Sequence, residues 1–385
     1  MNEFKRVQAA GTDINNELLK IWVARYLPNL EAISKHARPH VEQRLRRTIS
    51  DESRNITATK LDQHLASDCV LAATDTQQLL VTAGIKADTW EIQSLSVQIH
   101  SIYEALINRY RESFVFSPII EYLHLIDIEG SRLAAAARVI PKFENLLLII
   151  APMLRELEAI YFSSLNQHLV GFMTTQLHLT QQRIISHLSS EELIWLTPYL
   201  KLLNELICMP WKHICSATSV SHNVETIALV KRMMPKVSSI ATLTYQKALQ
   251  TFPNHTSYQG RIQSQSVQHS SLRDLSMFQA YIWLSVLEDS SSVIEKKLLP
   301  ICLQVFPLTG VRWELVTFAI GTIIDIIQEQ LSPTEQELFK AHAEYIKALF
   351  FNAQPKMRQV HLLKEQLKRN KTFSNVSYTW RPVEQ

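Results

Sequence analysis

The sequence predicts an all-α protein, and three observations support that prediction. Glycine accounts for only 7 of 385 residues, far below its usual share of about 7%. No Asn-Gly, Asp-Gly or Gly-Gly pair occurs, so the commonest hairpin turns have no sequence signal. Apolar residues recur at helical spacing in several segments. We therefore expect a multi-helix bundle in two helical subdomains, joined by a polar linker rich in Ser and Gln and followed by a basic C-terminal tail.

Apolar stripes predict individual helices along the chain. From Phe143 to Tyr161, and again from Leu193 to Ile207, apolar side chains recur every three or four residues. This spacing places them on one helix face, which must pack against another helix, as in a coiled-coil-like bundle core. The longest apolar stretch runs from Leu315 to Ile327 and contains Asp325. It is too short to span a bilayer and predicts a buried core helix.

Two similar phrases predict helix starts. "LSSEELIWLTPYLKLL" begins at Leu188 and "LSPTEQELFKAHAEYIKALF" begins at Leu331. Each has Ser followed three residues later by Glu, in the pairs Ser189/Glu192 and Ser332/Glu335. This is the capping-box pattern, which satisfies two otherwise unpaired backbone N–H groups. The repetition has two interpretations: an internal duplication, or independent use of a common cap.

Prolines predict helix boundaries. We expect Pro118, Pro141, Pro198 and Pro333 to lie in first helical turns, where the missing N–H costs nothing. Pro152 falls inside a strongly periodic run, so we expect a kink or break at that position.

Composition divides the chain into four parts. The clearest boundary is residues 251–274, "TFPNHTSYQGRIQSQSVQHSSLRD", which has the Ser/Gln-rich character of a flexible linker. Before it we predict a larger helical domain, 1–250, with a sub-boundary near 118–141. After it we predict a smaller helical domain, 275–352, and then a basic tail, 353–385.

The cysteines and the N-terminal residues predict a cytoplasmic protein. Four cysteines are spread widely, and the spacing of Cys208 and Cys215 matches neither a redox nor a zinc motif. We interpret all four as reduced thiols in the core. The first twenty residues have no apolar stretch of the secretory type.

The chain contains no local motif for catalysis. Phosphate-binding GxxxxGK[ST] and GxGxxG loops are absent, as are HExxH and GxSxG. The sequence therefore favours a protein that is not an enzyme. A catalytic site assembled from residues far apart in the sequence has no such signature, so the enzyme class stays open.

Two sets of residues are candidates for binding a metal or a cofactor. Glu121 and His124 form one E-x-x-H pair, which is half of a di-iron signature. A capped helix end with a partly buried histidine is the favoured interpretation, and we predict no metal site. His168, His178 and His187 lie on or near apolar helices, where a neutral imidazole could ligate haem or line a pocket for another tetrapyrrole. An ordinary buried histidine is the competing interpretation, so we predict no cofactor and keep the tetrapyrrole as the alternative.

The basic tail is the candidate site for a partner. Residues 353–385 hold seven basic and two acidic residues, a net charge of +5, whereas the whole chain carries +3. The remaining residues therefore carry −2, so the surplus positive charge is local. Such a segment suits an acidic protein surface, an anionic membrane or nucleic acid. Its candidate contacts are Lys356, Arg358, Lys364, Lys368, Arg369 and Lys371.

These observations lead to two functional hypotheses. The main one is a non-catalytic helical adaptor or regulator that acts through protein–protein contacts, with another protein as its partner and an anion-binding tail. The alternative is a helical-bundle sensor that encloses a small ligand such as haem or another tetrapyrrole. The alternative predicts a cavity beside one of the three middle histidines.

Overall fold

A computed structural model describes residues 51–82, 89–112, 143–163, 168–210 and 223–353, together with the single positions 18, 21, 22, 48, 50 and 214. Within these ranges nearly every residue is helical, and the one sheet described has two short strands. The all-α prediction is confirmed.

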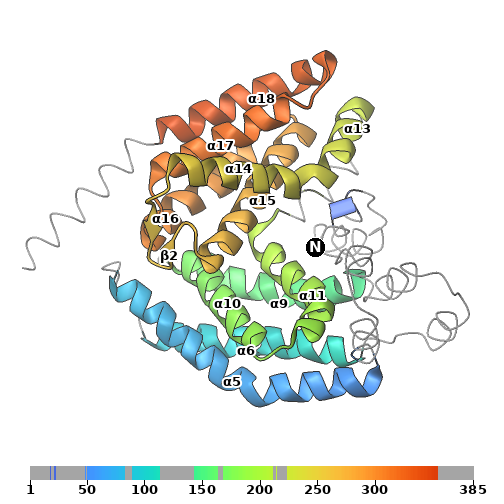
Figure 1. The fold of residues 1–385 in the computed structure, drawn as a ribbon, viewed down its shortest axis with the longest axis vertical. Coiled ribbons are helices and arrows are strands. Elements are labelled where there is room, and N and C mark those ends of the chain that lie inside the picture. Colours follow the sequence, from blue (N-terminus) through green and yellow to red (C-terminus); the bar gives the residue numbers. More distant parts are fainter. Residues whose placement is uncertain are drawn as a thin grey trace, which may run out of the picture.

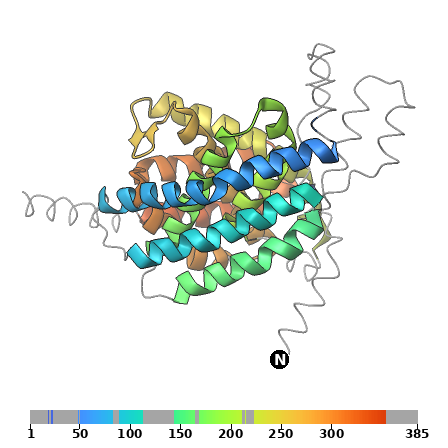
Figure 2. The ribbon, with the colours of Figure 1, turned by 90° about the horizontal axis from the view of Figure 1, so that it is seen from below.

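The N-terminal helices form one group, in the lower half of Figure 1. Helices α5 and α6 pack along each other, α9 lies against α6, and α10 lies against α5. Figure 2 shows α5, α6 and α9 side by side as a layer across this face. The group consists of α5 (Asp51–Thr82), α6 (Thr89–Glu112), α9 (Phe143–Ser163), α10 (His168–Ser186) and α11 (Ser190–Cys208).

The C-terminal elements form the second group, in the upper half of Figure 1. Its helices are α13 (Val224–Met233), α14 (Val237–Thr251), α15 (Gln265–Leu287), α16 (Leu299–Thr309), α17 (Trp313–Gln328) and α18 (Pro333–Asn352). A hairpin of β1 (Thr256–Ser257) and β2 (Gly260–Arg261) joins α14 to α15, and the short helices η1 (Met234–Lys236) and η2 (Ile294–Leu298) precede α14 and α16. Helix α10 packs against α16 and so connects the two groups.

Helix α15 is the centre of the second group. Every residue from Leu275 to Leu287 is buried, because α13, α14, α17 and α18 surround the helix. Its indole Trp283 lies against Phe339 of α18, with ring centroids 5.4 Å apart. Phe278 makes edge-to-face contacts with Phe306 and Phe350. An all-round apolar helix of this kind needs neighbours on every side.

The apolar stripes lie where the sequence predicts. Ile150, Leu154 and Leu157 are buried on α9, and Leu196, Leu200 and Leu203 are buried on α11. Residues 315–327 lie in α17, whose isoleucines belong to the core.

Two of the prolines in the described residues do not mark the helix boundaries that the sequence predicts. Pro333 is the first residue of α18, as predicted. Helix α11 continues through Pro198, which is therefore not in a first turn. Helix α9 likewise continues through Pro152, so the helix does not break there, and the alternative of a kink stays a prediction. In both helices strong apolar stripes on either side of the proline hold the segment as one element, and that packing outweighs one lost backbone hydrogen bond.

The segment predicted as a flexible linker is built into the structure. Residues 251–274 contain the last residue of α14, the hairpin and the first ten residues of α15. The hairpin is held to its surroundings because Tyr245 Oη donates to the Ile262 carbonyl at 2.6 Å and the Tyr258 N–H donates to the Thr309 carbonyl at 2.9 Å. Many of the serine and glutamine residues of this segment therefore belong to the partly exposed first turns of α15. The division of the chain into domains stays a prediction.

Both predicted capping boxes form. The Ser189 hydroxyl accepts from the Glu192 N–H while the Glu192 carboxylate accepts from the Ser189 N–H, at the start of α11. Ser332 and Glu335 repeat this arrangement at the start of α18. Glu192 also receives hydrogen bonds from Thr57 at 2.7 Å and Lys60 at 2.8 Å. Burial raises the pKa of Glu192, but these donors and the Ser189 N–H outweigh it and lower the pKa to about 2.

Replacing Ser332 by alanine should lower the free energy of unfolding by about 1 kcal/mol, because the Glu335 N–H loses its side-chain acceptor. Denaturant titration of the purified chain measures the change. Ser67→Ala is the matched control, since Ser67 is exposed within α5 and caps no helix. A Ser332→Ala variant no less stable than this control would contradict the role of the cap.

Candidate functional site

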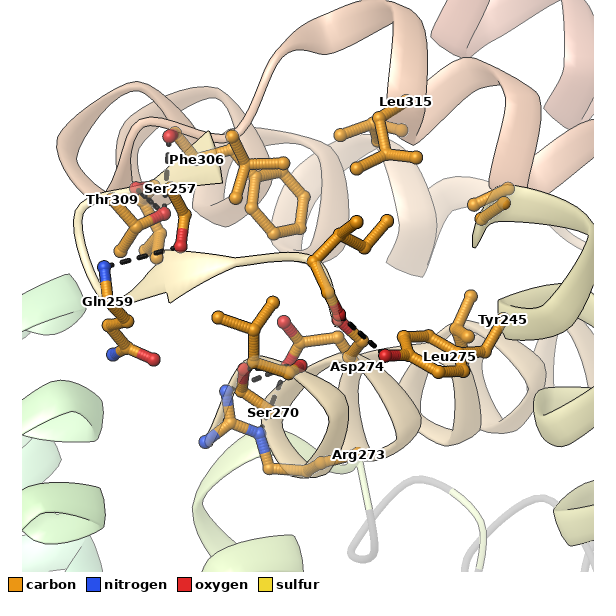
Figure 3. Close-up of a pocket in the computed structure, with 18 of the residues that line it drawn as sticks. Tyr245, Ser257, Gln259, Ser270, Arg273, Asp274, Leu275, Phe306, Thr309 and Leu315 are labelled. Atoms are coloured by element: carbon orange, nitrogen blue, oxygen red, sulfur yellow. Dashed lines mark hydrogen bonds and ion pairs between the residues drawn. The ribbon is translucent and has the colours of Figure 1, made fainter. Parts of the chain in front are cut away.

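A cavity lies where the two helix groups meet at the hairpin. It has a volume of about 120 Å³ and is partly open to solvent. Its walls come from α10, α14, the hairpin, α15, α16 and α17. Figure 3 shows the polar residues of the hairpin, of α15 and of α16 around this hollow, among them Ser257, Gln259, Arg273, Asp274 and Thr309.

Most of the wall is apolar. Helix α15 contributes Phe278, α16 contributes Phe306, and α17 contributes Leu315 and Ala319. An engineered apolar cavity of about 150 Å³ binds benzene. The cavity, at about 120 Å³, is of similar size and therefore has room for a single small ring.

One ion pair lies at the polar end of the cavity. The Arg273 guanidinium donates to one carboxylate oxygen of Asp274 through Nε at 3.0 Å and Nη2 at 2.8 Å. Both side chains line the cavity and are partly exposed. Because the two charges compensate each other, these two residues add no net charge to the wall.

His178 reaches the cavity from α10. Its side chain is buried, with the residue 7% exposed. The Gln182 amide nitrogen lies 3.0 Å from His178 Nε2. Burial lowers the pKa of His178 to about 3, and the positive charges of Arg273 and His269 act in the same direction. The imidazole is therefore neutral at physiological pH.

His255 reaches the cavity from the turn between α14 and β1. The residue is 3% exposed. Its backbone is fixed on both sides, since its N–H donates to the Phe252 carbonyl and its carbonyl accepts from the Ile262 N–H, both at 3.0 Å. Burial, and then the nearby Arg312, lower the pKa of His255. Two neutral imidazoles thus contribute to the lining of one cavity.

Of the three predicted histidines, the structure places His178 at the cavity. His187 lies elsewhere: its Nε2 is 3.0 Å from Asp68 Oδ2, and its ring stacks on His64 with centroids 4.2 Å apart. The backbone of His168 begins α10, and its side chain lies outside the described residues. The assignment of a ligand-binding role to any of the three stays a prediction.

The other predicted site residues fall outside the described part of the chain. These are Glu121 and His124, and the tail residues Lys356, Arg358, Lys364, Lys368, Arg369 and Lys371. The adaptor hypothesis and its protein, membrane or nucleic-acid partners therefore stay predictions.

Sequence reasoning did not identify His255 or the Arg273–Asp274 pair. All three lie in the stretch interpreted as a linker, where polar residues carry no periodic signal. The only cue was the presence of a histidine and two charges among serines and glutamines, which is equally typical of an exposed loop.

Two further features bear on the chemistry open to the described residues. They contain no group of three or more His, Cys, Asp or Glu side chains placed to hold a metal ion. No helix among them is long and apolar enough to cross a membrane.

Comparison with known proteins finds one partial similarity. A family model described as Phycobilisome protein matches residues 217–350, about a third of the chain. No curated protein and no solved structure matches. The matched segment contains α13 to α17, most of α18 and, apart from Thr174, Thr175 and His178, every residue that lines the cavity. The C-terminal helical group, which builds most of the site, is thus similar to the Phycobilisome protein family.

Proposed function

We propose that this protein is a helical-bundle sensor that binds a small ligand reversibly in the cavity flanked by His178 and His255. The observation that carries the proposal is the position of this cavity, which lies almost wholly in the segment similar to phycobilisome proteins. Members of that family bind bilins, which are open-chain tetrapyrroles. An open-chain tetrapyrrole is therefore the ligand class that the similarity favours.

The residues of the cavity do not fit covalent attachment through a thiol. No cysteine is among the described residues that line it. Cys302 of α16 is 1% exposed. Burial raises the pKa of its thiol well above the usual value, and the nearby Asp274 carboxylate raises it further. A buried, protonated thiol is a poor nucleophile. Binding without a thioether bond is what this site supports.

The site also does not fit haem. A rigid macrocycle is much larger than a cavity of about 120 Å³. In addition, His178 Nε2 already accepts from the Gln182 amide, and the ring nitrogens without a partner among the described residues, His178 Nδ1 and His255 Nε2, are not accessible from the cavity. An iron ligand needs a free imidazole lone pair.

An open-chain tetrapyrrole fits better, because it is flexible: one end ring would lie in the cavity and the remaining rings would extend from its open side. Phe278 and Phe306 would contact the ring that lies in the cavity, and Arg273 lies at the polar end of the cavity. Ser257, Gln259 and Ser270 of the lining would offer hydrogen-bonding groups to the tetrapyrrole. When bound, such a group would supply absorption of visible light.

Titrating the purified full-length chain with biliverdin tests the proposal. We expect saturable binding in the micromolar range, seen as a shift of the visible absorption band. Denaturation should release all of the pigment, since no thioether forms.

Two variants test the role of the cavity. Ala319→Phe fills it, whereas Ala341→Phe is the control and places the same side chain at an exposed position of α18. The first should abolish binding and the second should leave it unchanged, with circular dichroism confirming that both fold. No saturable binding by the wild-type chain, or equal binding by both variants, would refute the proposed function.

A further inference from the structure

The layer formed by α5, α6 and α9 (Figure 2) carries many exposed apolar side chains. Among the described residues thirteen large apolar side chains are exposed, and eight of them belong to these three helices. The eight are Ile56, Val70, Leu71, Val81, Trp90, Val97, Leu148 and Ile149. Single exposed apolar residues need no explanation, whereas a contiguous group marks a surface that binds a partner.

Helices α5 and α6 run antiparallel, and two contacts between them define which residues are neighbours. Near one end of the pair the Gln77 amide donates to Thr89 Oγ1 at 3.4 Å. Near the other end Arg111 forms an ion pair with Asp62. The last turns of α5 therefore lie beside the first turn of α6, and the middle parts of the two helices lie beside each other.

Four of the exposed apolar side chains gather along this pair of helices. Trp90 and Val97 are two turns apart on α6 and share one face of that helix. Val70 and Val81 are three turns apart on α5 and likewise share one face. Val81 lies in the last turn of α5, beside the turn of α6 that holds Trp90. The four residues are 62–72% exposed, so they form an apolar strip on the outer face of the layer.

The same layer holds the surplus negative charge of the described helices. The residues of α5, α6 and α9 include 11 acidic and 5 basic side chains, a net charge of −6. Residues 224–353, which build the C-terminal helix group, include 11 of each and are neutral. An apolar strip within a negative surface fits a partner segment that is both apolar and basic.

The basic tail of this protein has both properties. Residues 353–385 carry a net charge of +5, against −6 for the layer. Within residues 356–371 apolar residues alternate with the basic ones at steps of three and four, at positions Met357, Val360, Leu363 and Leu367. At helical pitch these side chains share one face, which is the pattern of a helix that binds an apolar surface.

The position of α18 decides which copy of the tail can reach the layer. Ala353 follows α18 in the C-terminal helix group, and α10 and α15 lie between α18 and the layer in Figure 1. Lys356 is three residues beyond Ala353 and can lie at most about 11 Å from it. The basic segment therefore begins beside the C-terminal group of its own chain and can extend toward the layer of another chain.

We propose that the outer face of α5, α6 and α9 binds the basic tail, residues 356–371, of a second copy of this protein. The layer and the tail are different surfaces, so the contact is head-to-tail, and each added copy still offers one layer and one tail. None of the four strip residues lines the cavity, and the proposal is therefore independent of the ligand.

Sedimentation velocity of the full-length chain tests the association. At low salt we expect monomers at about 1 µM and larger assemblies at about 100 µM. At about 1 M salt, where charges are screened beyond about 3 Å, the association should weaken at least about tenfold. A wild-type chain that stays monomeric at every concentration overturns the proposal.

Variants locate the two surfaces. Val97→Lys adds positive charge to the strip and should weaken the association at least about tenfold. Val224→Lys is the matched control, because Val224 is 77% exposed on α13 and should leave the association unchanged. A tail variant with Lys364, Lys368 and Arg369 all changed to Glu should be monomeric. Circular dichroism checks that each variant folds.

Mixing two variants decides whether the contact is between copies. The tail variant keeps an intact layer, and Val97→Lys keeps an intact tail. Each should be monomeric alone, and together they should form a one-to-one complex with an affinity close to that of the wild-type contact. A mixture that stays monomeric overturns the proposal.

Two other outcomes also contradict it. A tail variant that associates as the wild type does would mean that two layers pack against each other. Equal losses for Val97→Lys and Val224→Lys would mean that the strip is not the binding surface. If Val97→Lys does not fold, Glu104→Lys on the same face of α6 replaces it, with Glu337→Lys at an exposed position of α18 as its control.

Discussion

Between pH 6.5 and pH 4 the wild-type protein should lose about 3 kcal/mol more stability than a His178→Gln variant. The pKa of His178 is about 3 in the folded protein, because its ring is buried beside Arg273 and His269. In the unfolded chain a histidine has a pKa of about 6.5. Across this interval the unfolded state therefore binds one proton more than the folded state. Stability then falls as the pH falls, by about 1.4 kcal/mol for each pH unit.

Denaturant titrations at pH 6.5, 5 and 4 measure this effect as a difference between two proteins. Other groups also titrate in this range, but they are shared by the wild-type and variant chains and cancel in the comparison. Parallel profiles for wild type and His178→Gln would show that His178 is not held neutral.

Replacing Trp283 by alanine should cost about 4 kcal/mol of stability, as large-to-small substitutions of buried aromatic residues do. Trp283 is at the centre of α15 and lies against Phe339. Its indole N–H has no hydrogen-bond partner among the described residues. Trp283→Phe therefore breaks no hydrogen bond and relieves an unpaired polar atom, so it should cost clearly less, about 1–2 kcal/mol.

Chemical denaturation of both variants gives the two values. Trp90→Ala is the matched control, since Trp90 is 72% exposed on α6 and its loss should change stability by less than about 1 kcal/mol. Comparable losses for Trp283→Ala and Trp90→Ala would mean that α15 is not the core helix of the second group.

The proposed sensor function and the buried His178 both concern the contact between the two helix groups. The segment similar to phycobilisome proteins builds most of a cavity, and one helix from outside that segment adds a neutral imidazole to it. A ligand that contacts both would stabilise the packing of α10 against α16, because it binds only when the two groups are in place. Ligand binding would therefore strengthen the contact between the two helix groups, and this is how the protein would sense the ligand.

Local patterns allowed a good part of the fold to be predicted. The capping boxes at Ser189 and Ser332 involve residues three apart, so the sequence contains the whole interaction. The stripe in α9 and the apolar run in α17 predict burial because helical pitch alone puts their side chains on one face. The failures at Pro152 and Pro198 have the opposite origin: a local rule was outweighed by packing with helices distant in sequence.

The candidate site could be predicted only in part. His178 and His187 have similar sequence surroundings, yet one lines a cavity and the other pairs with Asp68 on α5. Which of the two meets the cavity depends on how α10 is rotated between α5 and α16, and no pattern within α10 specifies that rotation. His255 was hidden because a hairpin folded onto α16 has the same composition as a flexible linker.

The sequence by itself determined that this chain is helical, where two of its helices begin and which faces avoid water, since each depends on residues within a few turns of one another. Tertiary structure alone decided that α10, the hairpin and α15 enclose a cavity with two neutral imidazoles. The physical reason is that burial is a property of the surrounding elements and not of the histidine. It lowers the pKa of His178 and leaves its Nδ1 without a partner among the described residues.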